Sequence, residues 1–246
     1  MFYGGKKVVR SAVILGVGAD KGLGAKLAQR FSEKNLHIYL AGRTKDKVDT
    51  IAETIKKRNG HATAIVCDAT DEKQVIQLFN RAGSDIDLAI YNAGNNTPGR
   101  ICDMEAAYFE DSWRIGCFGG FLFGREAVRR MLPNKRGTLL FTGASASWRG
   151  RANYGAFNSA KGGLRNLAQA MAKEYAPEGV HVGHIVVDGV IDGDRVRERR
   201  PEIFKNLNSD QLLDIKLIVD GFEYLYHQSP RAWSFELDIR PSLEKW

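Results

Sequence analysis

The alternation of short apolar runs with helical segments constrains the fold of this chain more than any other feature of its sequence. We interpret the apolar runs at residues 11–16, 37–41, 62–67, 86–91, 138–142 and 180–187 as strands. These runs lack the apolar–polar alternation of a half-exposed strand, as expected when helices cover both faces of a parallel sheet. Repeated β–α units with right-handed crossovers build a doubly wound sheet. The sequence therefore predicts an α/β fold.

The composition fits one globular domain. Of the 246 residues, 43% are hydrophobic and 26% are charged, which excludes wholesale disorder. No linker, internal repeat or low-complexity segment interrupts the pattern, so residues 1–246 are predicted to form a single domain. The three cysteines, Cys67, Cys102 and Cys117, form no CxxC pair, and this argues against a disulfide scaffold and a metal site.

The net charge of +7 is scattered, apart from basic stretches at 125–151 and 195–205. Neither stretch carries interleaved aromatic residues or a nucleic-acid-binding motif, so we interpret both as solvated faces and expect no nucleic-acid partner. The sequence has no signal-peptide pattern and no run of about 18 apolar residues. We therefore expect a cytoplasmic protein with no membrane partner.

A glycine-rich turn, Gly18-Ala-Asp-Lys-Gly22-Leu-Gly24, lies directly between the first expected strand and the first expected helix. Glycines there permit positive φ and let the backbone approach a pyrophosphate, which the helix N-terminus stabilises. A purely structural turn would also explain the glycines, but their position at the start of a β–α series favours dinucleotide binding. The predicted cofactor-binding residues of this turn are Gly18, Asp20, Lys21, Gly22, Leu23 and Gly24.

The end of the second strand indicates which dinucleotide is bound. Sites that prefer NAD place a carboxylate there to hold the ribose 2′-hydroxyl, whereas this strand ends Leu40-Ala-Gly42-Arg43-Thr44. A guanidinium binds a phosphate through two hydrogen bonds, so Arg43 suits the 2′-phosphate, and Lys21 offers a second cation. The alternative is a solvated arginine at a helix start. We predict NADP(H) as the cofactor.

Gly18-x-x-x-Gly22-x-Gly24, then Asp68, then Asn92-Ala93-Gly94 form an ordered set. Over residues 8–240, the chain resembles the short-chain dehydrogenase/reductase family. The resemblance implies a Rossmann-type sheet of about seven strands, the last near 233–239. It also implies a homodimer or homotetramer packed through long helices near 110–131 and 155–175. The cofactor-binding positions that it implies are Asp68, Ala69, Asn92, Ala93, Gly94, Lys161, Gly189 and Ile191. Asp68 would contact adenine, and Gly189 with Ile191 would meet the nicotinamide carboxamide.

The catalytic positions depart from the family pattern of Asn, Ser, Tyr and Lys, in which the tyrosine lies four residues before the lysine. Lys161 is present, but Phe157 stands at the tyrosine position. Ala144 stands at the serine position, thirteen residues earlier, and Cys117 stands at the asparagine position. We interpret the chain as a divergent branch that lacks the usual catalytic Tyr, Ser and Asn.

Three residues could replace the missing proton donor. Tyr154 lies about one turn before Phe157 if the helix includes it, Ser145 adjoins the vacant serine position, and Asp188 could act as a desolvated acid. The alternatives are a loop or interface aromatic for Tyr154, a turn residue for Ser145 and a hydrogen-bonded cap for Asp188. The catalytic candidates are Lys161, Tyr154 and Ser145. Cys117 is expected to be a buried core residue rather than a reactive thiol.

Residues 191–217 follow the sixth strand, where the family resemblance implies a substrate lid. The segment includes Arg195, Arg197, Glu198, Arg199, Arg200 and Glu202. The arginines could select an anionic substrate, or they could form a solvated helix. Trp246 could reach a neighbouring subunit.

Two functions remain open at the level of sequence. The first is an NADP(H)-dependent oxidoreductase that acts on an unidentified small-molecule carbonyl or alcohol with a non-standard site. The alternative is a redox-silent NADP(H)-binding protein.

Overall fold

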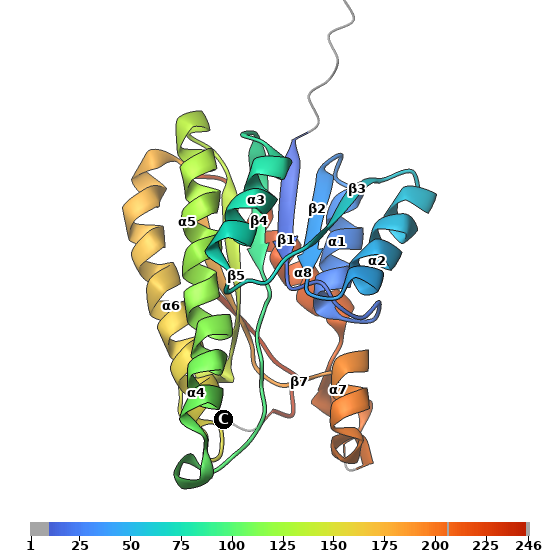
Figure 1. Cartoon of the computed structure of the whole chain (residues 1–246), viewed down its shortest axis with the longest axis vertical. Helices are drawn as coiled ribbons and strands as arrows, with labels where there is room; N and C mark the ends of the chain where they lie inside the picture. Colours follow the sequence, from blue (N-terminus) through green and yellow to red (C-terminus); the bar gives the residue numbers. More distant parts are fainter. Residues whose placement is uncertain (1–9, 206, 245–246) are drawn as a thin grey trace, which may run out of the picture.

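The sheet of this protein contains seven parallel strands in the order β3-β2-β1-β4-β5-β6-β9. A computed structural model describes residues 10–205 and 207–244 (Figure 1). The strands are β1 (Ser11–Leu15), β2 (His37–Gly42), β3 (His61–Val66), β4 (Ile86–Tyr91), β5 (Thr138–Ala144), β6 (His181–Val187) and β9 (Glu236–Ile239). The predicted α/β class and Rossmann-type sheet are confirmed.

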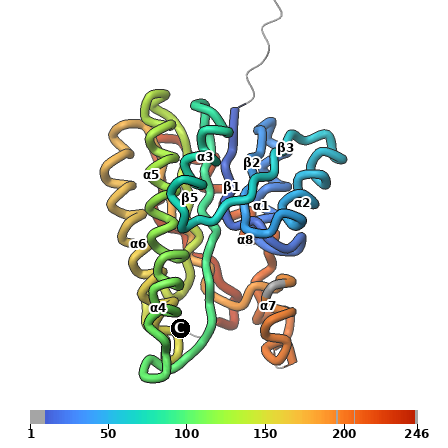
Figure 2. The backbone as a smooth tube through the Cα atoms, in the orientation of Figure 1, coloured from blue at the N-terminus to red at the C-terminus, as the bar shows by residue number. Residues whose placement is uncertain are grey.

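Helices cover both faces of this sheet. The described helices are α1 (Leu23–Ser32), α2 (Lys45–Lys57), α3 (Glu72–Ala82), α4 (Ala106–Trp113), α5 (Gly119–Met131), α6 (Gly155–Tyr175), α7 (Asp194–Arg199) and α8 (Ile215–Tyr226), and all but α4 and α7 belong to the two covering layers. One layer contains α1, α2 and α8, and the other contains α3, α5 and α6. In Figure 2, α5 and α6 run side by side at one end of the sheet, while α1 and α2 lie at the other end.

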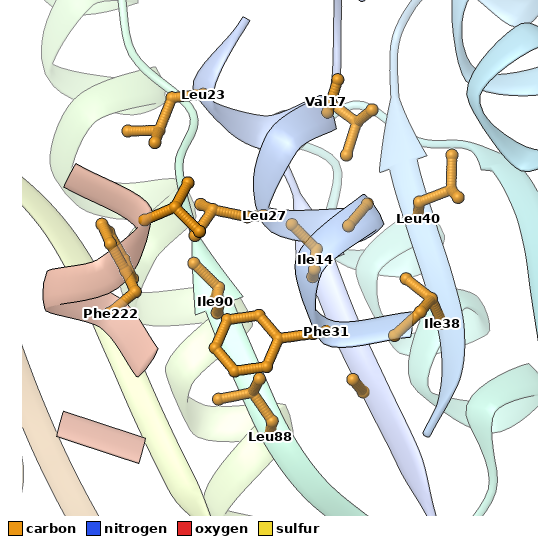
Figure 3. Packing of buried hydrophobic residues seen from close by; sticks show 14 of the residues in the cluster. Ile14, Val17, Leu23, Leu27, Phe31, Ile38, Leu40, Leu88, Ile90 and Phe222 are labelled. Atoms are coloured by element: carbon orange, nitrogen blue, oxygen red, sulfur yellow. The ribbon is translucent and has the colours of Figure 1, made fainter. Parts of the chain in front are cut away.

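Two hydrophobic cores explain why the strands lack polar alternation. Ala12 and Ile14 of β1 pack with α1 and α8, whereas Val13 and Leu15 pack with α3 and α5. Figure 3 shows the first core, in which Phe31 of α1 lies close to β4. Because successive side chains of a strand point to opposite faces, both sets of positions must be apolar when both faces are covered.

The long helix expected at 110–131 begins earlier and is interrupted. It consists of α4 and α5, joined by a π-helical turn at Arg114–Phe118. The Tyr91 hydroxyl, from β4, donates a hydrogen bond to the Ile115 carbonyl within this turn. The helix expected at 155–175 agrees with the observed α6, Gly155–Tyr175.

The lid segment expected at 191–217 is closed at its base by two short paired strands. These are β7 (Val190–Ile191) and β8 (Leu212–Leu213), and α7 lies between them in the sequence. In Figure 1, α7 and α4 lie beyond the sheet on the side where β1 ends, at the bottom of the view. β9 begins at Glu236, three residues later than expected, and Trp246 lies outside the described residues.

Candidate functional site

The glycine-rich turn between β1 and α1 is built by close packing against the end of β4. A Cβ at Gly16 would lie 2.4 Å from the Asn92 carbonyl carbon, and a Cβ at Gly24 would lie 2.5 Å from the Gly16 oxygen. The positive φ expected in this turn occurs at Gly16 (φ +104°) and not at Gly18, Gly22 or Gly24 among the described glycines. Gly24 is therefore needed for close approach, and Gly16 both for its φ and for close approach.

Gly18 has a different environment from its neighbours. A Cβ at this position would meet no atom of the described chain within 4 Å, so internal packing does not require glycine there. Gly22 follows as the N-cap of α1 and provides no side-chain cap for the first amides of the helix. Open space beside an uncapped helix N-terminus fits a bound pyrophosphate.

Arg43 is exposed and directly follows β2. A Cβ at the preceding Gly42 would lie 2.1 Å from the Val17 oxygen, so the end of β2 packs against the glycine-rich turn. Lys21 lies nearer to the lid: its amide donates to Asp194 Oδ2 at 3.3 Å. Arg43 and Lys21 thus lie at the same edge of the sheet, where a cationic site for a phosphate was predicted.

Asp68 lies two residues after β3, at the carboxyl end of that strand. Its Oδ1 accepts hydrogen bonds from the Thr70 amide (2.8 Å) and hydroxyl (2.9 Å). The neighbouring Ala69 is buried, and a Cβ at Gly119 would lie 2.8 Å from its carbonyl oxygen. The position of Asp68 at the same edge as the glycine-rich turn fits the expected adenine contact.

A continuous chain of hydrogen bonds joins the glycine-rich turn to Lys161. The Asn92 side-chain amide donates to the Gly16 oxygen at 3.1 Å, and the Thr142 hydroxyl donates to Asn92 Oδ1 at 3.0 Å. Lys161 Nζ donates to the backbone carbonyl oxygen of Thr142 at 2.7 Å, and a Cβ at Gly94 would lie 3.6 Å from Lys161 Nζ. The structure therefore brings together the predicted residues Asn92, Gly94 and Lys161.

Phe157 lies one helical turn before Lys161 on α6. Its ring centroid is 6.0 Å from Lys161 Nζ, and the ring is half-buried. A phenyl ring carries no hydroxyl, so the aromatic group nearest to Lys161 in the α6 sequence has no proton to exchange.

Tyr154 lies outside α6. The helix begins at Gly155 and Tyr154 is its N-cap residue, so the condition that the helix includes Tyr154 is not met. The ring lies 5.0 Å from the Arg151 guanidinium, and the backbone forms a bridge with Gly99. The hydrogen bond that Arg200 donates to Glu202, and then one between Arg200 and Tyr154, raise the pKa of Arg200. Tyr154 thus contacts loops and the lid.

Ser145 and Asp188 lie in contrasting surroundings. Ser145 is half-buried and begins a 3₁₀ turn directly after β5, at the edge where Lys161 lies. Asp188 is only 1% exposed, and Arg149 Nη2 donates to both of its oxygens at 3.0 and 3.1 Å. Arg240 Nε lies 3.9 Å from the same carboxylate. Both Asp188 oxygens are therefore occupied by arginine, which agrees with the alternative of a hydrogen-bonded residue.

Cys117 lies within the π-helical turn and packs against α6. A Cβ at Gly163 would lie 3.0 Å from its sulfur, and burial raises the pKa of the thiol. At the same crossing, a Cβ at Gly116 would lie 2.6 Å from the Ala160 Cβ. The prediction that Cys117 is a buried core residue is confirmed, and a raised pKa opposes thiolate chemistry.

The lid arginines are partly neutralised within the lid. Arg197 Nε donates to Asp192 at 2.6 Å, and Arg200 forms an ion pair with Glu202. The Arg197 guanidinium also lies 4.4 Å from the Phe204 ring centroid. Selection of an anionic substrate by this segment stays a prediction.

Sequence reasoning missed a polar cluster of buried Ser147 and His184 with half-buried Glu236. His184 Nδ1 lies 2.9 Å from Glu236, and Nε2 lies 3.4 Å from Ser147 Oγ. The available signal was the pair of histidines, His181 and His184, within a strand of otherwise non-polar residues, but the partners of His184 are far away in the sequence. No helix in the described part of the chain is long and apolar enough to cross a membrane.

Comparison with known proteins agrees with this arrangement of glycine-rich turn, parallel sheet and lysine. The family model described as short chain dehydrogenase matches residues 12–203, which is more than half of the chain. The chain belongs to the short-chain dehydrogenase family.

Relatives of this short-chain dehydrogenase support the same conclusion. A crystal structure of a short-chain dehydrogenase from Rhodopseudomonas palustris shares 32% identity, covering 94% of this chain and 99% of that one, with a TM-score of 0.79. Glucose 1-dehydrogenase of Gluconobacter oxydans (strain 621H) is 27% identical over 77% of this chain and 71% of its own length. A metagenomic short-chain oxidoreductase solved in complex with NADP shares the fold, at 20% identity and a TM-score of 0.80, over 95% of this chain and 97% of that one.

Proposed function

We propose that this chain is an NADP(H)-dependent oxidoreductase that interconverts an alcohol and a carbonyl of a small molecule. The observation that carries the proposal is the hydrogen-bonded chain from Gly16 through Asn92 and Thr142 to Lys161. It fixes the lysine relative to the turn beside which the dinucleotide would lie. A fixed relative position of cofactor and substrate contributes several kcal/mol to such a reaction.

The residues at the carboxyl edge of the sheet fit a bound dinucleotide. The open space at Gly18 and the N-terminus of α1 would receive the pyrophosphate, and Lys161 would hold the nicotinamide ribose. Arg43 would bind the 2′-phosphate, with Lys21 as a second cation, and this favours NADP(H). The metagenomic oxidoreductase of similar fold was solved with NADP. When bound, the nicotinamide supplies or accepts the hydride.

The proton must come from a group other than residue 157. Loss of a positioned general acid or base typically lowers a rate by ~10²–10⁴-fold, so a working enzyme needs a substitute for the tyrosine. Of the two catalytic candidates that could replace the tyrosine, Ser145 is better placed than Tyr154, because Ser145 lies at the end of β5 and Tyr154 lies among the loops. The lid at 191–217 would cover the substrate, and the chain would act as a cytoplasmic homodimer or homotetramer.

Calorimetric titration of the full chain with NADPH and NADH tests the cofactor assignment. We expect tighter binding of NADPH, and a loss of that preference in Arg43→Ala. The matched control is Arg81→Ala, which removes an exposed arginine in the last turn of α3. Equal affinity for both cofactors in the wild type would contradict the assignment of Arg43, and failure to bind either would contradict the proposed function.

The second candidate function is a redox-silent NADP(H)-binding protein. Phe157 beside Lys161 favours it, because the pair lacks the acid needed for hydride chemistry. This candidate predicts NADPH binding without turnover, and Phe157→Tyr alone would not restore activity because Ala144 and Cys117 remain. Oxidation of cofactor by any carbonyl substrate in the wild type would exclude it.

A further inference from the structure

We propose that Ser147, His184 and Glu236 form a proton relay that accepts the proton of an alcohol substrate in place of the missing tyrosine. This inference rests on the proposed oxidoreductase function. Ser147 would be the residue that meets the substrate oxygen. His184 and Glu236 would act through it as positioning and proton-holding residues.

The hydrogen-bond partners of His184 define its tautomer. The Glu236 carboxylate only accepts hydrogen bonds, so His184 Nδ1, at 2.9 Å from Oε2, carries the hydrogen. Nε2 then presents a lone pair to Ser147 Oγ at 3.4 Å, and the serine hydroxyl donates to it. A separation of this length is common in unliganded sites and shortens when substrate binds. Serine, imidazole and carboxylate thus lie in the order that moves a proton inward.

Glu236 is fixed as a charged group. Arg165 donates to both of its oxygens, at 2.6 and 2.9 Å, and the Trp148 indole donates to Oε1 at 3.0 Å. Burial alone would raise the pKa of Glu236, but the bonds from Arg165 and Trp148 outweigh it and lower the pKa. A carboxylate held in this way can stabilise an imidazolium at His184.

His184 is neutral at rest. The side chain is fully buried, and burial lowers its pKa to about 4, although Glu236 acts in the opposite direction. The charged groups that act on it are Glu236 from β9 and Lys161 with Arg165 from α6, and the two cations favour the neutral ring. A neutral imidazole with a lone pair on Nε2 is a proton acceptor.

The relay reaches the edge of β5 where Lys161 lies. Ser147 Oγ accepts a hydrogen bond from the Ala144 amide at 3.2 Å, so its hydroxyl adjoins the serine position of the family. A Cβ at Gly143 would lie 2.3 Å from His184 Nε2, and glycine there lets the ring approach the strand end. These contacts place the relay beside the lysine and not in a separate part of the fold.

The chemical step balances in both directions. In oxidation, the C–H bond of the alcohol would break, and a bound oxidised nicotinamide would be the acceptor of the hydride and its electron pair. The O–H bond breaks as well: its proton passes to Ser147 Oγ while the serine proton passes to His184 Nε2. The resulting imidazolium is paired with Glu236, and once the product has left it returns its proton to Ser147 Oγ as the serine proton passes to solvent. In reduction, the imidazolium is the proton source and the same bonds form in reverse.

The test measures NADP⁺-linked oxidation of D-glucose, D-sorbitol and cyclohexanol, and NADPH-linked reduction of cyclohexanone, by the full chain. Ser147→Ala and His184→Gln should lower kcat by about 10²–10³-fold while the KM for the alcohol and the Kd for NADP⁺ stay within about threefold. Wild-type reduction should accelerate as the pH falls toward the pKa of His184, and this dependence should disappear in His184→Gln. The matched control is His181→Gln, a buried histidine of the same strand.

Histidine tautomers provide a second readout that needs no substrate. In ¹⁵N-labelled protein with five histidines, the resonance lost in His184→Gln identifies His184, and it should show hydrogen on Nδ1. Hydrogen on Nε2 instead would overturn the relay. If His184→Gln does not fold, Ser147→Ala, which removes one oxygen atom, carries the kinetic test. The histidine resonance that differs between the spectra of the wild type and Ser147→Ala is then assigned to His184.

The outcomes separate the two proposals. Turnover that is unchanged in Ser147→Ala would overturn the relay and leave the oxidoreductase standing. An equal fall of kcat in His181→Gln would show a loss of packing and would also overturn the relay. A wild-type chain that turns over none of the substrates in either direction would overturn both proposals.

Discussion

The free energy of unfolding should fall as the pH is lowered from 7.5 to 5, because His184 is buried as a neutral imidazole. Burial lowers its pKa from 6.5 to about 4. Between these values the unfolded chain binds a proton that the folded chain does not, so lower pH favours unfolding. The stability that the neutral His184 contributes is complete above its pKa in the unfolded chain and is lost as the pH falls through its pKa in the folded chain. Linkage gives a loss of about 2 kcal/mol at pH 5 and about 3 kcal/mol below pH 4.

Urea unfolding of the wild type and His184→Gln at pH 7.5, 6 and 5 measures this loss. Groups that do not contact His184 titrate in parallel in both chains, so the difference between their unfolding free energies isolates His184 together with its partner Glu236. That difference should shrink by about 2 kcal/mol between pH 7.5 and 5. His227→Gln, which replaces an exposed histidine, is the control and should follow the wild type. Parallel curves for the wild type and His184→Gln would refute the reasoning.

Three further predictions follow from particular residues. Gly18→Ala should leave the melting temperature within about 2 °C and weaken NADPH binding, whereas Gly16→Ala should destabilise the fold by about 2 kcal/mol or more, because its Cβ would meet the Asn92 backbone. Calorimetry measures the binding and thermal melts measure the stability, and a destabilised Gly18→Ala would contradict the reasoning. Iodoacetamide at pH 8 should label exposed Cys102 before buried Cys117, as read by peptide mass spectrometry; equal labelling would contradict the burial of Cys117. Phe157→Tyr should raise kcat by less than about tenfold, and a larger gain would mean that the tyrosine is the one missing part.

Much of the fold could be predicted because both faces of each strand are covered. The apolar runs mark β1, β2 and β4 to within one residue, since no polar face divides them. The apolar pattern placed the start of the last strand too early. An apolar residue occupies position 233 although it lies outside β9, because the Trp233 ring stacks on the His181 ring with the centroids 5.0 Å apart. Packing on a ring and pairing in a sheet leave the same apolar signal.

The candidate site divides in the same way. The glycine-rich turn and Lys161 have local patterns and could be found in the sequence. The π-helical turn at Arg114–Phe118 could not, because the hydroxyl that satisfies its carbonyl comes from Tyr91 on another element. The contact between His184 and Glu236 joins residues 52 positions apart and depends on the pairing of β6 with β9. Such contacts appear only once the topology is known.

The pairing of β7 with β8 has a consequence for how this protein could diversify. Because the two short strands hold the ends of the lid together, the chain between them leaves and re-enters the body of the protein at one place. The entropic cost of a loop with fixed ends grows only slowly with its length. Residues could therefore be inserted, deleted or exchanged in that segment at little cost to the sheet below. If this segment covers the substrate as proposed, it is a replaceable module through which new substrates could be recruited while the sheet stays as it is.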